Sequence, residues 1–145
     1  MKCTTLKAVS SALLLSGNLL VAPVLIAATA EATPMTSIPA TIEGIWHAID
    51  AKSAELKKTI TAGKLDEVHH QAFAIRDLVA ALPARSSSLP AEKLAKVQGG
   101  VKFVATLAER LDATGDANDL AGTKQNYDKL IALLESMRSR YTPAP

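Results

Sequence analysis

The sequence predicts an all-α protein in which four helices form an antiparallel up-down-up-down four-helix bundle. Apolar residues recur at alternating spacings of three and four along four segments, which is typical of helices that bury one face. Glycine or proline stands at the ends of these segments, where both are common in helical proteins. The chain has one tryptophan, two tyrosines and two phenylalanines among its 145 residues. Because strands favour β-branched and aromatic side chains, this composition favours helices.

Residues 1–30 have the pattern of a cleaved signal peptide. Lys2 and Lys7 form a basic start, and residues 12–28 are apolar. Residues 28–30 (Ala-Thr-Ala) then present the small side chains that a signal peptidase accepts. An uncleaved membrane anchor is the alternative, but the apolar run is shorter than the roughly 20 residues that a spanning helix needs. We therefore expect a periplasmic protein without stable membrane association after cleavage.

The charges and the cysteine content exclude several classes of function. Without residues 1–30, two of the sixteen Lys and Arg residues are lost. The remaining chain has fourteen basic and fourteen acidic side chains. This balance argues against nucleic acid as a partner, because nucleic acid is bound chiefly through clustered Lys and Arg. Cys3 is the only cysteine and lies in the signal peptide, so we expect neither disulfides nor thiol chemistry in the mature chain. No glycine-framed serine or phosphate loop occurs, and we expect no enzymatic activity.

The first helix is expected at about residues 39–62, after a flexible linker over residues 31–38. Pro39 falls in its first turn, where a missing backbone N–H does no harm. Gly63 is expected to end the helix, because glycine readily adopts the left-handed conformation found there. The predicted buried stripe consists of Ile42, Ile45, Ile49, Leu56 and Ile60.

The second helix is expected at about residues 64–82, with Pro83 ending it and a Ser-rich loop following. Asp66 and Glu67 lie in its first turn, where negative charge is favourable. The spacing of its apolar residues is that of a helix packed against its neighbours along one face. These residues are Leu65, Val68, Ala72, Ile75, Val79 and Leu82.

The third helix is expected at about residues 90–113, with Pro90 at its start. Its predicted buried residues are Leu94, Val97, Val101, Val104, Ala108 and Leu111. Gly99 and Gly100 interrupt it, at a cost in helix propensity of about 1 kcal/mol each relative to alanine. We interpret the pair as a close approach of helices or a kink. The alternative is that it leaves room for a flat ligand against the backbone.

The fourth helix is expected at about residues 117–141, followed by a tail at 142–145. Gly115 is expected to end the third helix, and Asp116 to cap the fourth. The predicted inward residues are Leu120, Tyr127, Leu130, Ile131, Leu134, Met137 and Tyr141.

The two halves of the mature chain are similar to each other. Gly63 and Gly115 are 52 residues apart, and at that offset the buried positions of the second helix fall on those of the fourth. The chain is thus two helix-Gly-helix hairpins joined by the Ser-rich loop. Neither hairpin can bury its stripe alone, and an antiparallel four-helix bundle is the simplest arrangement that buries both.

The histidines are the candidate metal ligands. His69 and His70, together with Asp66, could offer imidazole and carboxylate groups to copper or zinc. We expect His70 on the solvent side and His69 on a flank shared with Phe73 and Arg76. The alternative is an ordinary solvated helix face.

A second group of this kind lies on the first helix, at Glu43, His47 and Asp50. His47 is expected to be exposed, at the opposite end of the bundle from His69 and His70. The separation is roughly 20 Å at the rise of an α-helix, so this arrangement excludes a single site with three histidines.

The signal peptide, the length, the four helices, the glycine-turned hairpins and the C-terminal run LLESMRSRY resemble the soluble periplasmic b-type cytochromes. The resemblance covers nearly the whole mature chain and implies a four-helix bundle. Members of that family hold haem between a methionine early in the first helix and a histidine near the end of the last. The matching positions here are Ile49 and Arg138, so neither haem ligand is retained, and arginine cannot replace histidine on iron. A site formed by His47 and Met137 is conceivable, but we interpret Met137 as a core residue.

These observations predict an exported, non-enzymatic four-helix-bundle binding protein, with a metal ion or another protein as its partner. One version is a periplasmic metal-handling accessory that binds copper or zinc weakly through His69, His70 and Asp66. The alternative is a cytochrome b-like electron-transfer protein with haem in the bundle. The protein is expected to be a monomer or a homodimer.

Overall fold

The computed structural model describes residues 37–141. The predicted signal peptide, most of the predicted linker and the predicted tail lie outside this range. The described residues form, in chain order, α1 (Ile42–Thr61), a single 3-10 turn η1 (Leu65–Glu67), α2 (Val68–Ala80), α3 (Leu82–Arg85), α4 (Ala91–Asp116) and α5 (Leu120–Arg138). This part of the chain contains no strand, which confirms the all-α prediction.

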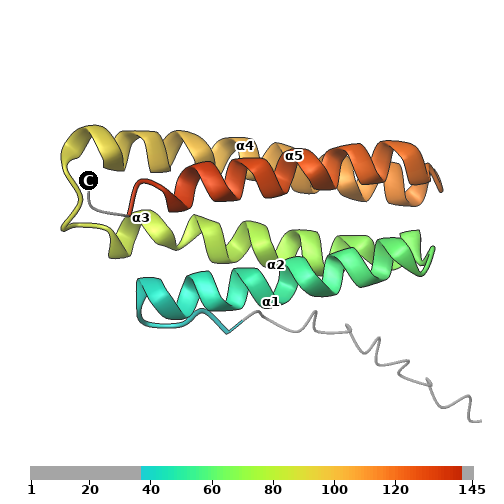
Figure 1. Cartoon of the computed structure of the whole chain (residues 1–145), viewed down its shortest axis with the longest axis horizontal. Coiled ribbons are helices and arrows are strands. Elements are labelled where there is room, and N and C mark those ends of the chain that lie inside the picture. The colour runs from blue at the N-terminus through green and yellow to red at the C-terminus, as the bar shows by residue number, and fades with distance from the viewer. Residues whose placement is uncertain (1–36, 142–145) are drawn as a thin grey trace, which may run out of the picture. The chain divides into compact units, whose positions relative to one another are not determined.

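The four long helices lie side by side (Figure 1). The main contacts are those of α2 with α1 and α4 and that of α4 with α5, while α1 and α5 share a smaller contact. The stripe predicted for the second helix is confirmed at all its positions, because every one of those residues is buried. None of the helices within residues 37–141 is both long and apolar enough to cross a membrane.

The end of α1 agrees with the prediction, but its start does not, because Pro39 precedes the helix instead of lying in its first turn. The Thr41 side chain accepts a hydrogen bond of 3.1 Å from the Gly44 N–H and caps the helix. Gly63 follows the helix with a φ of 73°, a left-handed conformation that glycine adopts without steric cost. Ile45, Ile49 and the other predicted stripe residues of α1 are buried, except for the half-buried Ile42.

Pro83 does not end the second helix as expected. The chain turns at Ala81, and Pro83 then lies within the first turn of the short helix α3. A proline is tolerated there because the first N–H groups of a helix have no partner within that helix.

The expected roles of Gly115 and Asp116 are wrong. Both residues lie inside α4, and the left-handed residue after this helix is Asn118, with a φ of 52°. Asp119 caps α5 instead, by accepting a hydrogen bond of 2.9 Å from the Gly122 N–H. Gly115 is buried, and a Cβ there would collide with the backbone carbonyl of Leu65. This glycine therefore permits a close approach of α4 to η1.

The prediction that Leu120 faces inward is also wrong, because its side chain is 41% exposed. The first half of α5 is instead anchored by two buried polar residues. The Thr123 hydroxyl donates to the Thr114 hydroxyl of α4 at 3.1 Å, and the Asn126 amide donates to the Arg110 carbonyl of α4 at 3.3 Å. Hydrogen bonds of this kind remove most of the cost of burying polar groups.

Candidate functional site

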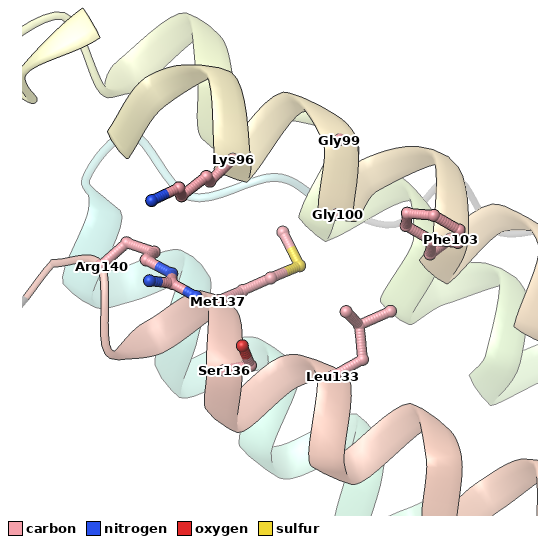
Figure 2. A pocket seen from close by; sticks show the side chains of 8 residues that line it. All are labelled: Lys96, Gly99, Gly100, Phe103, Leu133, Ser136, Met137 and Arg140. Carbon is pink, nitrogen blue, oxygen red and sulfur yellow. The ribbon is translucent and has the colours of Figure 1, made fainter. Parts of the chain in front are cut away.

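A groove of about 330 Å³ lies between α4 and the C-terminal part of α5 (Figure 2). Small-molecule sites in proteins usually have volumes of about 300 to 1,000 Å³, so the groove is at the lower end of that range. Its lining residues are Lys96, Gly99, Gly100, Phe103, Leu133, Ser136, Met137 and Arg140.

The two glycines of α4 have different surroundings in this groove. Gly100 is buried under Met137, and a Cβ at this position would lie 2.6 Å from the Met137 sulfur. Gly99 has no heavy atom within 4 Å of the place where its Cβ would be, so it borders open space. The close helix approach predicted for the pair therefore holds at Gly100, and free space adjoins the backbone at Gly99.

The groove has an apolar end and a cationic end. Phe103 and Leu133 lie toward one end, and Lys96 and Arg140 lie toward the other (Figure 2). The side chain of Phe103 is 66% exposed, which is high for a large aromatic residue. The exposed ring therefore adds apolar surface to this end of the groove.

Glu92 is the carboxylate that lies near the cationic end. Its Oε1 atom is 2.6 Å from the Lys96 ammonium nitrogen. The hydrogen bond from Lys96, with a further contribution from the Lys96 charge and a smaller one from Arg140, lowers the pKa of Glu92. Glu92 is therefore ionised at neutral pH, and Lys96, Arg140 and Glu92 together carry a net positive charge.

His69 and His70 have the exposures that the sequence predicts. His70 is exposed and His69 is half-buried. The two imidazole rings lie 4.0 Å apart, centroid to centroid, and the His69 ring lies 6.5 Å from that of Phe73. The Arg76 guanidinium lies over the Phe73 ring at 4.6 Å, which completes the predicted flank.

The carboxylate predicted to join this histidine pair is not assembled with it. Asp66 is an exposed residue of η1. Within residues 37–141, no group of three or more His, Cys, Asp and Glu side chains is arranged to hold a metal ion. The structure thus brings the two imidazoles together without a third ligand, and metal binding by the pair stays a prediction.

The second predicted group, on α1, is not assembled either. Glu43 and His47 are exposed, and Asp50 accepts a hydrogen bond of 2.5 Å from the Arg138 guanidinium. The same guanidinium lies 4.7 Å from the centre of the Trp46 ring. Arg138 therefore links α5 to α1.

Ile49 and Arg138, the two positions that the predicted cytochrome resemblance matches to haem ligands, have structural contacts in this chain. Ile49 is buried in the core, and Arg138 is engaged with Asp50 and Trp46. Met137 is 3% exposed and covers Gly100, which confirms its interpretation as a core residue.

A cluster around Trp46 was not predicted from the sequence. The Tyr141 ring meets the Trp46 ring edge-on at 5.8 Å, and the Tyr141 hydroxyl shares a hydrogen bond of 2.8 Å with the Ser86 hydroxyl. Ser86 follows α3 and is fully buried. The cluster therefore ties together α1, the end of α3 and the C-terminal end of the described chain.

No family model, curated protein or solved structure matches this chain. The functional argument therefore rests on the geometry of the groove and of the histidine pair.

Proposed function

We propose that this protein is an exported, non-enzymatic binding protein whose helices form an antiparallel up-down-up-down four-helix bundle. Short connections between consecutive long helices support the antiparallel arrangement. The pattern of residues 1–30 supports export to the periplasm. Its binding site is the groove between α4 and α5, and its ligand is a small molecule with a flat or short apolar body.

The observation that carries this proposal is the open space over Gly99. A helix position that faces the groove lacks a side chain, although alanine would fit and would favour the helix by about 1 kcal/mol. The neighbouring Phe103 ring is largely exposed, so a ligand on the Gly99 backbone would cover apolar surface that water now contacts. The groove thus offers both the room and the driving force for binding.

Binding can be tested with phenylnaphthylamine, a neutral aromatic dye that fluoresces when it leaves water. The mature protein should increase the dye's fluorescence saturably. Gly99→Leu should abolish this signal, because its side chain would fill the open space next to the Gly99 backbone, where the ligand is proposed to lie. The matched control is Ala113→Leu, which adds a leucine to an exposed position of α4 away from the groove. Equal dye binding by both variants would exclude the groove as the site.

A metal-handling accessory function is the second candidate, and the contact between the two imidazole rings favours it. Rings 4.0 Å apart on an accessible part of α2 could share a copper or zinc ion with ligands from solvent or from a partner. Calorimetric titration of the mature protein with either ion should then show a site that is lost in His69→Ala and His70→Ala. An absence of binding up to millimolar metal would remove this candidate.

A further inference from the structure

We infer that the groove selects amphipathic anions, in which a carboxylate or sulfonate head is joined to the flat or short apolar body. The inference rests on the function proposed above and specifies its ligand class. The head would lie between Lys96 and Arg140, and the body would lie over Gly99 against Phe103 and Leu133.

The distribution of charge along the groove supports this orientation. Lys96 extends from α4, and Arg140 from the turn after α5, into the same end of the groove (Figure 2). The mature chain as a whole carries equal numbers of basic and acidic side chains, so the positive charge here is local. The end of the groove opposite Lys96 and Arg140 is lined by the apolar side chains of Phe103 and Leu133. These side chains would favour the apolar body of the ligand over its charged head.

The two cations are available to a ligand although Glu92 lies nearby. The Lys96–Glu92 pair joins residues one helical turn apart, and both side chains are largely exposed. Exposed pairs of this kind contribute little to stability, so an incoming anion can compete for Lys96. A lysine ammonium also has three donors, of which Glu92 uses one.

Arg140 is the second part of this anion site. Within residues 37–141 it forms no ion pair, and its guanidinium offers a planar set of donors suited to a carboxylate or sulfonate. The hydroxyl of Ser136, which is exposed on the groove's edge, could donate an additional hydrogen bond.

The test compares two dyes with similar aromatic bodies, the anionic anilinonaphthalene sulfonate and the neutral phenylnaphthylamine. The wild-type protein should bind the anionic dye more tightly. Lys96→Gln/Arg140→Gln should weaken binding of the anionic dye by about tenfold and leave the neutral dye unaffected, since two partly exposed charge pairs are lost. Glu92→Gln should strengthen binding of the anionic dye, because it removes the competing carboxylate.

Lys102→Gln/Arg110→Gln is the matched control, because it removes the same charge from exposed positions of α4 outside the groove. It should leave binding of both dyes unchanged. If both double variants weaken the anionic dye equally, the effect is one of net charge and the anion site is refuted. If the wild-type protein binds both dyes with equal affinity, the anion preference is refuted while the proposed groove function stands. If it binds neither dye, both proposals fail.

Membrane lipids also combine an anionic head with an apolar body. A separate measurement must therefore distinguish a soluble amphiphile from a membrane surface. We expect a small soluble amphiphile, because the groove is short and is bordered by helices on two sides. Laurate, used below its micelle concentration, should displace the anionic dye. Cosedimentation with phosphatidylglycerol vesicles, in the absence of displacement by laurate, would overturn this assignment in favour of a membrane surface.

Discussion

The Met137 side chain in α5 occupies the space that a Cβ would need at Gly100 in α4. The contact brings the two helices together on one side of the groove, while the adjacent Gly99 leaves the backbone uncovered. Two neighbouring glycines thus serve different purposes, and alanine substitutions should separate them.

Gly99→Ala should raise the free energy of unfolding by about 1 kcal/mol, because alanine favours the helix and its Cβ meets no neighbouring atom. Gly100→Ala should lose most of this gain, because the Met137 side chain must move out of a tightly packed position. Urea unfolding followed by circular dichroism measures both values. Equal stabilisation by the two substitutions would show that Met137 does not pack on Gly100.

Gly115→Ala should be the most damaging of the glycine substitutions, with a loss of about 2 kcal/mol or more. Its Cβ would meet the Leu65 carbonyl and a methyl group of Val68, and a backbone carbonyl cannot rotate away as the end of a methionine can. The same unfolding experiment tests this prediction. A variant as stable as the wild type would contradict the close approach of α4 to η1.

Arg138→Ala should lower the free energy of unfolding by about 1 kcal/mol, because it removes an exposed ion pair and a cation-π contact. Asp50→Asn should cost less, because the Arg138 guanidinium would keep its position over Trp46. The fluorescence of Trp46, the only tryptophan, reports the contact directly and should change more in Arg138→Ala than in Asp50→Asn. A larger loss of unfolding free energy in Asp50→Asn than in Arg138→Ala would assign the main stabilisation to the ion pair.

The two tyrosines should make the protein less stable in alkali. Burial raises the pKa of Tyr127 and of Tyr141 above the ordinary value of about 10, and the charge of Asp128 adds to the effect at Tyr127. Above pH 10 the unfolded chain therefore loses these protons before the folded chain does. The stability due to the neutral tyrosines is complete below pH 10 and is lost as the pH rises through the folded pKa values.

Unfolding measured between pH 8 and about pH 12 tests this linkage. Tyr127→Phe/Tyr141→Phe should show a smaller loss of stability across this range than the wild type. An unchanged pH dependence in the double variant would assign the alkaline loss to other groups.

The sequence predicts the helical stripes well because periodicity directly reflects burial. Val68, Ile75 and Val79 are buried as expected, and Gly63 ends its helix in the left-handed conformation. Helix-end glycines and close-packing glycines look alike in a sequence, however, which is why the expectation for Gly115 failed. The residue that turns the chain there is Asn118, which can also adopt positive φ.

The groove was only partly predictable. The Gly99-Gly100 pair indicated either close packing or room for a flat ligand, but only the position of Met137 shows which glycine serves which purpose. The exposure of Phe103 could have been predicted. Val101 and Val104 belong to the buried stripe of this helix, and Phe103 does not share their spacing, so its aromatic ring is expected on another face. The approach of Lys96 to Arg140 could not be predicted, because it depends on how α4 and α5 are aligned.

The most direct test of the central claim is a titration of isotopically labelled protein comprising residues 31–145 with anilinonaphthalene sulfonate, followed by amide NMR. The account predicts saturable shifts centred on the amides of Gly99, Gly100 and Phe103, with smaller shifts near Leu133 and Arg140 and none at His69. Saturable shifts centred elsewhere, or no shifts at millimolar dye, would contradict the assignment of the groove between α4 and α5 as the binding site.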